Sequence, residues 1–187
     1  MDVQDAIRTR CSLKDKLSPK PIEPETIRRL LEAARWAPSA RNMQPWRFVV
    51  VRDQDMVRRL ADSAFFGPST VVRDAPVLLV VCSNPEDDVT VDDKPYHLYD
   101  VGSAVQNVLL AATDMGLVTH PLLSYDEVAV RKILGIPADV RVVIATPLAY
   151  PATAYEEASA ERLAGRSRRP LDELAFEGEW GTPFSVS

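Results

Sequence analysis

Apolar residues recur along the chain at two kinds of spacing, and together they predict helices that alternate with strands. Spacings of three and four residues predict helices over residues 3–11, 24–37, 53–64 and 99–115. Continuous apolar runs over residues 46–51, 76–82 and 140–150 are typical of buried strands, and residues 117–123 form a further candidate strand. Residues 65–74 and 84–95 are expected to be loops. Elements that alternate around one sheet indicate an α/β or α+β fold in three layers.

Proline and capping signals set several expected boundaries. Pro38 ends the second helix one residue earlier, because the residue before a proline avoids helical geometry. The run from Ser124 to Glu127 matches a capping box and opens a helix over residues 124–134. Pro147 lies inside the last apolar run, so the far half of that strand is expected to bend or to lie at a sheet edge.

The expected helix over residues 99–115 carries apolar side chains on nearly every face. A helix without a polar face lies in a core or at a subunit interface. With 187 residues, the chain suits a single domain over residues 1–187, in which residues 152–187 form a polar C-terminal extension.

Composition narrows the classes of partner. The chain has 22 Lys and Arg against 27 Asp and Glu, a formal net charge of −5, which argues against nucleic acid because phosphate backbones are bound by basic surfaces. The longest apolar run, residues 75–82, is too short to span a bilayer, and the acidic first residues contain no secretory signal. The two cysteines form neither a metal spacing nor a disulfide framework, so we expect a cytoplasmic protein.

Familiar catalytic and nucleotide-binding motifs are absent from the sequence. The glycines build neither of the Gly-rich phosphate loops, and no serine lies in G-x-S-x-G. The histidines, His97 and His120, lie outside H-E-x-x-H, and the paired acids at residues 87–88 and 92–93 are expected to be solvated loop residues. We therefore expect no metal site and no certain catalytic side chain, because a bound cofactor would carry the chemistry.

Three separated segments carry candidate binding chemistry. Arg10, Ser12 and Lys14 alternate, so an extended chain presents all three on one side as donors for a phosphate, with a charged surface turn as the alternative. Residues 37–46 join a helix to a strand, where ligand loops are common. The amides of Asn42 and Gln44 suit the imide edge of a planar ligand, although Asn42 could instead close an Asx turn. Residues 166–173 form a basic cluster in an acidic tail, with a solvated linker as its alternative.

Taken in order, these segments resemble the FMN-dependent nitroreductase family. The resemblance is carried by R-x-S-x-K at residues 10–14, by A-P-S-A-x-N-x-Q-P-W-x-F at residues 37–48 and by D-x-G-x-A-x-Q-N at residues 100–107. It continues with L-x-A-A-x-x-x-G-L at residues 109–117, L-G-I-P at 134–137, A-Y-P at 149–151 and R-R-P-L at 168–171. The stretch A-P-S-x-x-N-x-Q-P-W is its specific part.

The resemblance implies an α+β fold of three layers (α/β/α), a mixed sheet flanked by helices, and an intertwined homodimer with FMN at the interface. It also implies an oxidoreductase that takes electrons from NADH or NADPH and reduces nitroaromatic, quinone or related acceptors by ping-pong two-electron transfer. In such proteins the early basic segment and the late arginines bind the FMN phosphate, a loop of the partner subunit borders the flavin, and the segment after G-L lies against the ring. The C-terminal extension would contribute to phosphate binding and to the dimer. The implied cofactor-binding residues are Arg10, Cys11, Ser12, Lys14, Pro38, Ser39, Ala40, Asn42, Gln44, Pro121, Leu122, Leu123, Arg166, Arg168 and Arg169.

Two departures from the family pattern bear on activity. Cys11 stands where the family often has Arg or His, and residues 118–124 replace a Gly-rich pattern beside the ring. The short chain also predicts an open, promiscuous site. The alternatives are a flavin-binding carrier or sensor with little turnover, or a relative that reduces enones or fragments flavin. A flavin-independent nucleotide-binding domain is a third alternative, weakened by the missing glycine loops.

Overall fold

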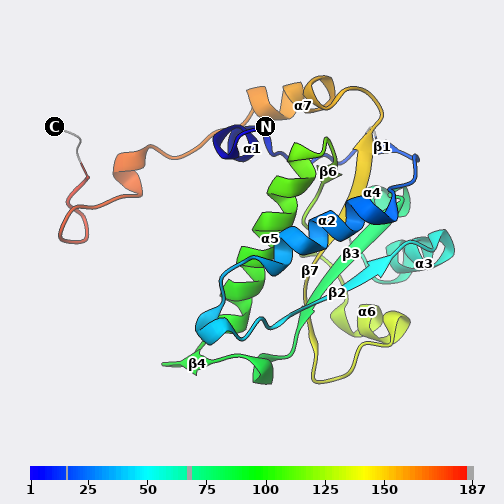
Figure 1. Cartoon of the computed structure of the whole chain (residues 1–187), viewed down its shortest axis with the longest axis horizontal. Helices are drawn as coiled ribbons and strands as arrows, with labels where there is room; N and C mark the ends of the chain where they lie inside the picture. Colours follow the sequence, from blue (N-terminus) through cyan, green and yellow to red (C-terminus); the bar gives the residue numbers. More distant parts are fainter. Residues whose placement is uncertain (16, 67–68, 185–187) are drawn as a thin grey trace.

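The central feature of the computed structural model is an antiparallel sheet (Figure 1); the structure describes residues 1–15, 17–66 and 69–184. Its long strands are β2 (Trp46–Val51), β3 (Val77–Ser83) and β7 (Arg141–Pro151), in the spatial order β2-β3-β7. Short strands β1 (Leu17–Ser18) and β6 (Val118–Thr119) also pair with β7. Every pair of named strands in the described residues is antiparallel, so the expected mixed sheet is reduced to one isolated parallel bridge, between Ser12 and Thr119.

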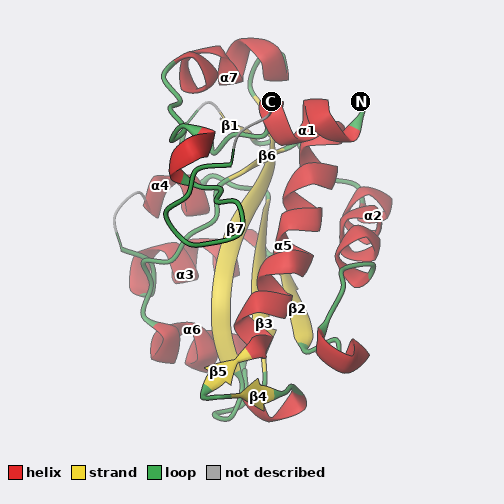
Figure 2. Ribbon diagram, turned by 90° about the vertical axis from the view of Figure 1, so that its left-hand side faces the viewer, coloured by secondary structure: helices red, strands yellow, loops and turns green. Residues whose placement is uncertain are grey.

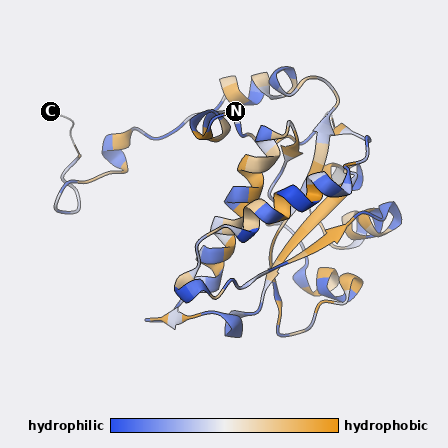
Figure 3. Ribbon diagram, in the orientation of Figure 1, coloured by the Kyte–Doolittle hydropathy of each residue, from blue (hydrophilic) through white to orange (hydrophobic). Residues whose placement is uncertain are grey.

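Helices cover both faces of this sheet, which confirms the three-layer α+β prediction (Figure 2). Helices α2 (Pro24–Arg35) and α5 (Tyr96–Asp114) pack on one face, and α3 (Gln54–Ser63), α4 (Ser69–Arg73) and α6 (Glu127–Leu134) pack on the other. Strand β3 is buried along its whole length because its alternate residues enter both layers. The long strands accordingly form the most apolar part of the chain in Figure 3.

Two small helices close one end of the sheet. Helix α1 (Val3–Thr9) lies beside α7 (Tyr155–Ala164), and both lie near the C-terminal end of α5 (Figure 1). A third apolar cluster joins them through Cys11, Leu13 and Tyr155. The expected helix over residues 3–11 is therefore confirmed but ends at Thr9, whereas α7 falls in a region expected to be a polar extension.

Several expected boundaries are wrong for local reasons. Residues 65–74, expected as a loop, contain α4, and the 84–95 loop contains the short helix η2 (Pro85–Asp87) and the hairpin of β4 (Thr90–Val91) and β5 (Lys94–Pro95). Of the strand expected over residues 117–123, only β6 is regular, followed by an isolated bridge from Leu122 to Ala145.

The predicted capping box at Ser124 does not form. The N-cap of α6 is Asp126, whose carboxylate accepts a hydrogen bond from the Ala129 N–H at 3.0 Å. The Ser124 carbonyl instead accepts from the Phe66 N–H, which ties this segment to the end of α3. Glu127 pairs with Arg141 on β7 rather than returning to the helix start.

Pro147 lies inside the sheet rather than at its edge. It pairs with Leu78 of β3 on one side, so the expectation of an edge strand is wrong. Ala145 exchanges backbone hydrogen bonds with Leu122, and Pro147, two residues later, turns its nitrogen to the same side. There the pairing with β6 is interrupted: the His120 N–H donates to the hydroxyl of Thr146 instead, at 3.1 Å. The sheet thus tolerates a proline because its missing donor faces a gap in the ladder.

The chain beyond α7 leaves the body of the molecule (Figure 1). It contains the short helix η3 (Leu171–Glu173) and a hooked turn closed by Phe184 N–H to Ala175 carbonyl. Its apolar side chains are strongly exposed, with Trp180 at 92% and Leu171 at 66%. The apolar side chains of this arm are therefore not stabilised by burial in this chain's own core.

Candidate functional site

The segment at residues 10–14 presents its polar side chains on one side, as its alternation predicts. Cys11 and Leu13 are buried in the cluster under α7, while Arg10 and Ser12 are half-buried and Lys14 is exposed. The segment is held by the Leu13 N–H, which donates to the Thr119 carbonyl at 3.3 Å. Neither cation forms an ion pair or side-chain hydrogen bond with any described residue, so both are available to an anion.

Cys11 does not face this side. Its backbone N–H donates to the Tyr155 hydroxyl at 3.4 Å, and its sulfur lies 3.8 Å from the same oxygen. The pleat that turns Arg10 and Ser12 outward turns the Cys11 side chain into the cluster under α7, away from the side on which a phosphate would bind.

The two ends of the chain meet at Arg166. Its guanidinium donates to the backbone carbonyl of Arg10 at 2.9 Å and to that of Arg8. Because its donors are directed at carbonyls, Arg166 fixes the crossing of the C-terminal chain over the end of α1. Arg168 and Arg169 lie beyond the crossing and are exposed, and Arg168 donates to the neighbouring Ser167 carbonyl at 2.6 Å. The structure thus brings one of the three late arginines to the basic segment.

His120 lies among cations beside the same segment. Burial lowers the pKa of His120, and the charges of Lys14 and Arg162 lower it further, so its ring is neutral near pH 7. Its Nδ1 is buried and has no hydrogen-bond partner among the described residues. Arg162, on the last turn of α7, was missed by sequence reasoning because residues after 152 carry no strong helical signal.

The segment that follows His120 offers one backbone donor. Pro121 has no N–H, and the Leu122 N–H donates to the Ala145 carbonyl at 2.8 Å. The Leu123 N–H forms no hydrogen bond to the described part of the chain, and the Leu123 side chain is 76% exposed. Of the three residues expected near a flavin ring, Leu123 is therefore the one that can donate to a ligand.

The loop at residues 38–45 is held in an unusual backbone conformation. Arg41, Asn42 and Gln44 have φ values of 49°, 59° and 50°, in the left-handed region that side chains other than glycine seldom adopt. The Gln44 N–H donates to the Ser39 hydroxyl at 3.0 Å, and its side-chain amide donates to the Asn42 carbonyl at 3.2 Å. The Asn42 amide bonds to no described residue, so the alternative of an Asx turn is wrong and this amide is displayed outward.

Asp100 anchors this loop from inside α5. It is 1% exposed, and its carboxylate accepts the Ala40 N–H at 2.7 Å. Burial raises the pKa of Asp100, the Ala40 hydrogen bond opposes that shift, and the nearby carboxylate of Asp88 raises the pKa further. Sequence reasoning noted Asp100 only within a motif, although a carboxylate in an apolar helix signals a buried partner.

The loop and the basic segment lie at opposite ends of α5. Asp100 holds the loop near the start of the helix, whereas the N-terminal ammonium of Met1 pairs with Asp114 at its end. Fourteen residues of helix separate these anchors by about 21 Å. Within one chain the loop and the basic segment are therefore held apart.

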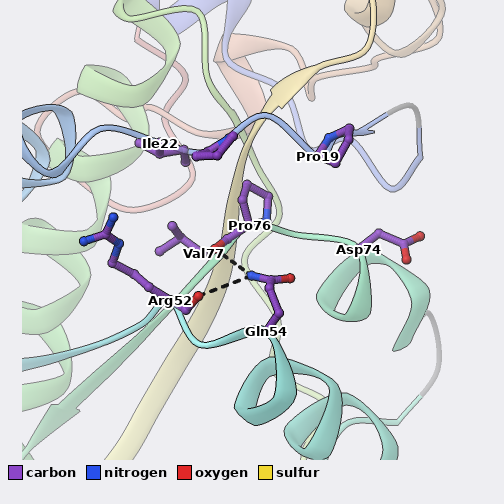
Figure 4. A pocket seen from close by; sticks show the side chains of 8 residues that line it. Pro19, Ile22, Arg52, Gln54, Asp74, Pro76 and Val77 are labelled. Atoms are coloured by element: carbon purple, nitrogen blue, oxygen red, sulfur yellow. Dashed lines mark hydrogen bonds between the residues drawn. The ribbon is translucent and has the colours of Figure 1, made fainter.

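Two cavities of different character lie on the surface. One of about 600 Å³ is lined by residues of α5, α6 and β7 and by Leu123. Another, of about 290 Å³, lies between residues 19–22 and the starts of α3 and β3, with Arg52 and Asp74 on opposite sides (Figure 4). The Gln54 amide donates to the Pro76 carbonyl there at 3.0 Å. The cofactor-binding residues expected from the sequence do not line this second cavity.

Metal-binding clusters and membrane-spanning helices are both absent from the described residues. Over residues 1–15, 17–66 and 69–184, no three His, Cys, Asp or Glu side chains are grouped so that they could hold a metal ion. Within the same ranges, no helix is both long and apolar enough to cross a membrane.

Comparisons with known proteins point to one family. A sequence model described as "Nitroreductase family" matches residues 7–69 and 66–150. A relative from Archaeoglobus fulgidus named "Putative NADH dehydrogenase/NAD(P)H nitroreductase" is 36% identical over 151 residues, covering 78% of this chain and 83% of the relative.

Solved structures of nitroreductase family proteins have the same fold as this chain. A nitroreductase family protein from Clostridium novyi NT superposes with a TM-score of 0.78 at 28% identity, over 98% of this chain and 97% of that one. A structure from Desulfovibrio desulfuricans described as "a putative nitroreductase in complex with fmn" gives a TM-score of 0.76 at 31% identity, over 96% of this chain and 98% of that one.

Proposed function

The chain belongs to the nitroreductase family of oxidoreductases, and we propose that it binds FMN and uses NADH or NADPH to reduce nitroaromatic, quinone or related acceptors. The observation that carries this proposal is the pair of cations, Arg10 and Lys14, that are free among the described residues, beside the chain crossing at Arg166 at one end of the sheet. The available Leu123 N–H lies further along β7, next to the Leu122–Ala145 bridge. A relative in the same family is described in complex with FMN, which supports the choice of flavin.

The residues at this end of the sheet fit FMN. Arg10, Ser12 and Lys14 supply charge-assisted donors for the phosphate, and Arg166 holds the backbone of that segment in place. The buried Nδ1 of His120 without a partner lies in the same cationic surroundings, which suit a ligand rich in acceptors. When bound, FMN would supply the two-electron redox chemistry that links a nicotinamide donor to a second acceptor.

The protein's own contribution is binding and electrostatics. The Leu123 N–H is the donor available beside the ring, and Lys14 supplies positive charge that favours the anionic reduced cofactor. His120 is half-buried and neutral near pH 7, because burial and the neighbouring cations lower its pKa, so it adds no competing positive charge. No described side chain is required as a general acid or base for the flavin half-reaction.

A homodimer would complete this site. The anchor of the Asn42 loop, Asp100, and the anchor of the N-terminus, Asp114, lie about 21 Å apart along α5, so the loop and the basic segment of one chain are held toward opposite ends of this helix. Two copies that pack their α5 helices antiparallel about a two-fold axis place the loop of each beside the basic segment of the other. The loop of the partner would then border the flavin bound by the first chain.

The surface of α5 supports that packing. Tyr99, Gly102 and Gln106 form an outward stripe, so the helix is not apolar on every face as expected, and a groove of about 520 Å³ lies along this stripe. Gly102 has no atom within 4 Å of the position a Cβ would take, which leaves room for close approach of a second helix. The exposed Trp180 and Leu174 of the C-terminal arm would find apolar cover on the partner.

The test is spectroscopic. The purified protein is expected to be yellow, to be bleached anaerobically by NADH or NADPH, and to be reoxidised by a quinone or nitroarene. Tight FMN binding without turnover would instead identify a flavin carrier or sensor. A colourless protein that neither takes up FMN nor consumes NAD(P)H, but binds ATP, would refute the proposal.

A further inference from the structure

The cavity of about 600 Å³ beside Leu123 contains a histidine that the flavin site does not use. This volume is in the range of small-molecule pockets. Leu98 and Leu123, which are 49% and 76% exposed, provide an apolar rim. The lining residues are Pro95, His97, Leu98, Leu123, Tyr125, Glu127, Arg141, Val142 and Val143.

The hydrogen bond of His97 fixes its tautomer. Its Nδ1 lies 2.7 Å from the Ser83 hydroxyl, and both residues are buried. The Ser83 hydroxyl has no other acceptor among the described residues, and a buried hydroxyl proton without an acceptor is costly. Ser83 therefore donates to Nδ1, which leaves the proton of the neutral imidazole on Nε2.

The Nε2–H of His97 can reach the cavity. This N–H forms no hydrogen bond to any described residue, and its nitrogen is not fully buried, so it is accessible from outside. Since His97 lines the cavity and its other nitrogen is engaged, Nε2 is its remaining polar edge. Burial lowers the pKa of His97 and Arg141 lowers it further, whereas Asp88 opposes the shift, so the ring is a neutral donor near pH 7.

The other polar groups of the wall are already satisfied or balanced. The Tyr125 hydroxyl donates to the Val142 carbonyl at 2.8 Å. Glu127 and Arg141 pair through two hydrogen bonds of 2.8 and 2.9 Å, so their charges offset each other. A ligand of this cavity thus meets a wall of mixed polarity, in which His97 offers the neutral side-chain N–H donor and the charges of Glu127 and Arg141 offset each other.

We propose that this cavity is the binding site for the electron acceptor, and that His97 donates a hydrogen bond from Nε2 to a carbonyl oxygen of a neutral quinone. The inference rests on the proposed function, because Leu123 would join the cavity to the flavin ring. The inference goes beyond the proposed function because it names the residue that selects the acceptor. A sulfonated quinone is disfavoured, because no unpaired cation faces an anionic group.

The experiment uses the purified full-length protein and three variants. His97→Leu removes the donor, His97→Gln returns an amide N–H near the position of Nε2, and Leu98→Arg blocks the rim. Because Leu98 also borders the α5 groove, sedimentation of Leu98→Arg must show an unchanged oligomeric state. Binding is measured with 4-hydroxyacetophenone, a neutral aromatic ketone, by NMR of the His97 ring. Turnover is measured as KM for menadione, with ferricyanide as an acceptor that needs no ring pocket.

We expect the ketone to shift the His97 resonances of the unmodified protein, and Leu98→Arg to abolish the shift. His97→Leu should raise the KM for menadione about tenfold, the loss expected for one hydrogen bond, with ferricyanide turnover unchanged and much of the loss recovered in His97→Gln. An unshifted His97 ring, or a menadione KM unchanged in both His97→Leu and Leu98→Arg, would overturn the inference. A protein that is never reduced by NAD(P)H, yet shows the ketone shift, would refute the proposed function while leaving this pocket in place.

Discussion

Removing the two cations of the basic segment provides the sharpest test of where the phosphate binds. Arg10→Ala and Lys14→Ala each delete a cation that forms no ion pair with a described residue, so neither change leaves a buried partner unsatisfied. The free energy of unfolding should therefore change little, whereas the affinity for FMN should fall.

The magnitude follows from the contacts that would be lost. A charge-assisted hydrogen bond is worth about 1.5–3 kcal/mol, and solvent screening at this open end of the sheet argues for the lower value. Two such losses amount to about 3 kcal/mol, or about 150-fold in Kd for the double variant. Riboflavin has the same ring and no phosphate, so its affinity should be almost unchanged.

The assay is a fluorescence titration of the apoprotein with FMN and with riboflavin. The matched control is Arg29→Ala, which removes an exposed cation from α2. An equal loss of affinity for both flavins would mean that the segment supports the fold rather than the phosphate. An unchanged FMN affinity in the double variant would refute the assignment outright.

Three further predictions follow from single features. Asp100→Ala leaves the Ala40 N–H without its acceptor and should loosen the loop, weakening FMN binding about tenfold or more in titrations, whereas Asp100→Asn keeps an acceptor and should retain most of the affinity. Gly102→Leu meets open space in one chain and should raise monomer stability by about 0.8 kcal/mol through helix propensity, yet shift the protein to monomer in sedimentation; a stable dimer would contradict the α5 interface. Burial lowers the pKa of His97 and His120, so below the unfolded value of 6.5 the unfolded chain takes up protons first and stability should fall as pH falls. Denaturant titrations at several pH values give the free energy of unfolding, which should fall less steeply with decreasing pH in His97→Gln than in the unmodified protein. An equal pH dependence would refute the assignment of this effect to His97.

The long buried elements could be predicted from the sequence because the burial of apolar side chains dominates their stability. Strand β3 is apolar at every position, and α2 and α3 carry a single apolar stripe, so burial alone fixes their type. The alternation of Arg10, Ser12 and Lys14 likewise survives folding, since the pleat of an extended chain is a local property.

What the sequence could not predict depends on distant partners. Ser124 and Asp126 are both good caps, and the choice between them is made by the backbone contact of Ser124 with Phe66, far away in sequence. The tolerance of Pro147 depends on which side of β7 faces the gap in β6. The use of Asp100 as a loop anchor depends on where its helix passes the loop, which no local pattern encodes.

The claim that each flavin is held by two chains is tested most directly in a mixed dimer. One differently tagged chain carries Arg10→Ala with Lys14→Ala, the other carries Asp100→Ala, and the heterodimer is isolated by sequential affinity steps. If the basic segment of one chain pairs with the loop of its partner, both defects fall on one site and the other site is intact. The account predicts one tightly bound FMN per mixed dimer; no tightly bound FMN at all would mean that each site is built within one chain.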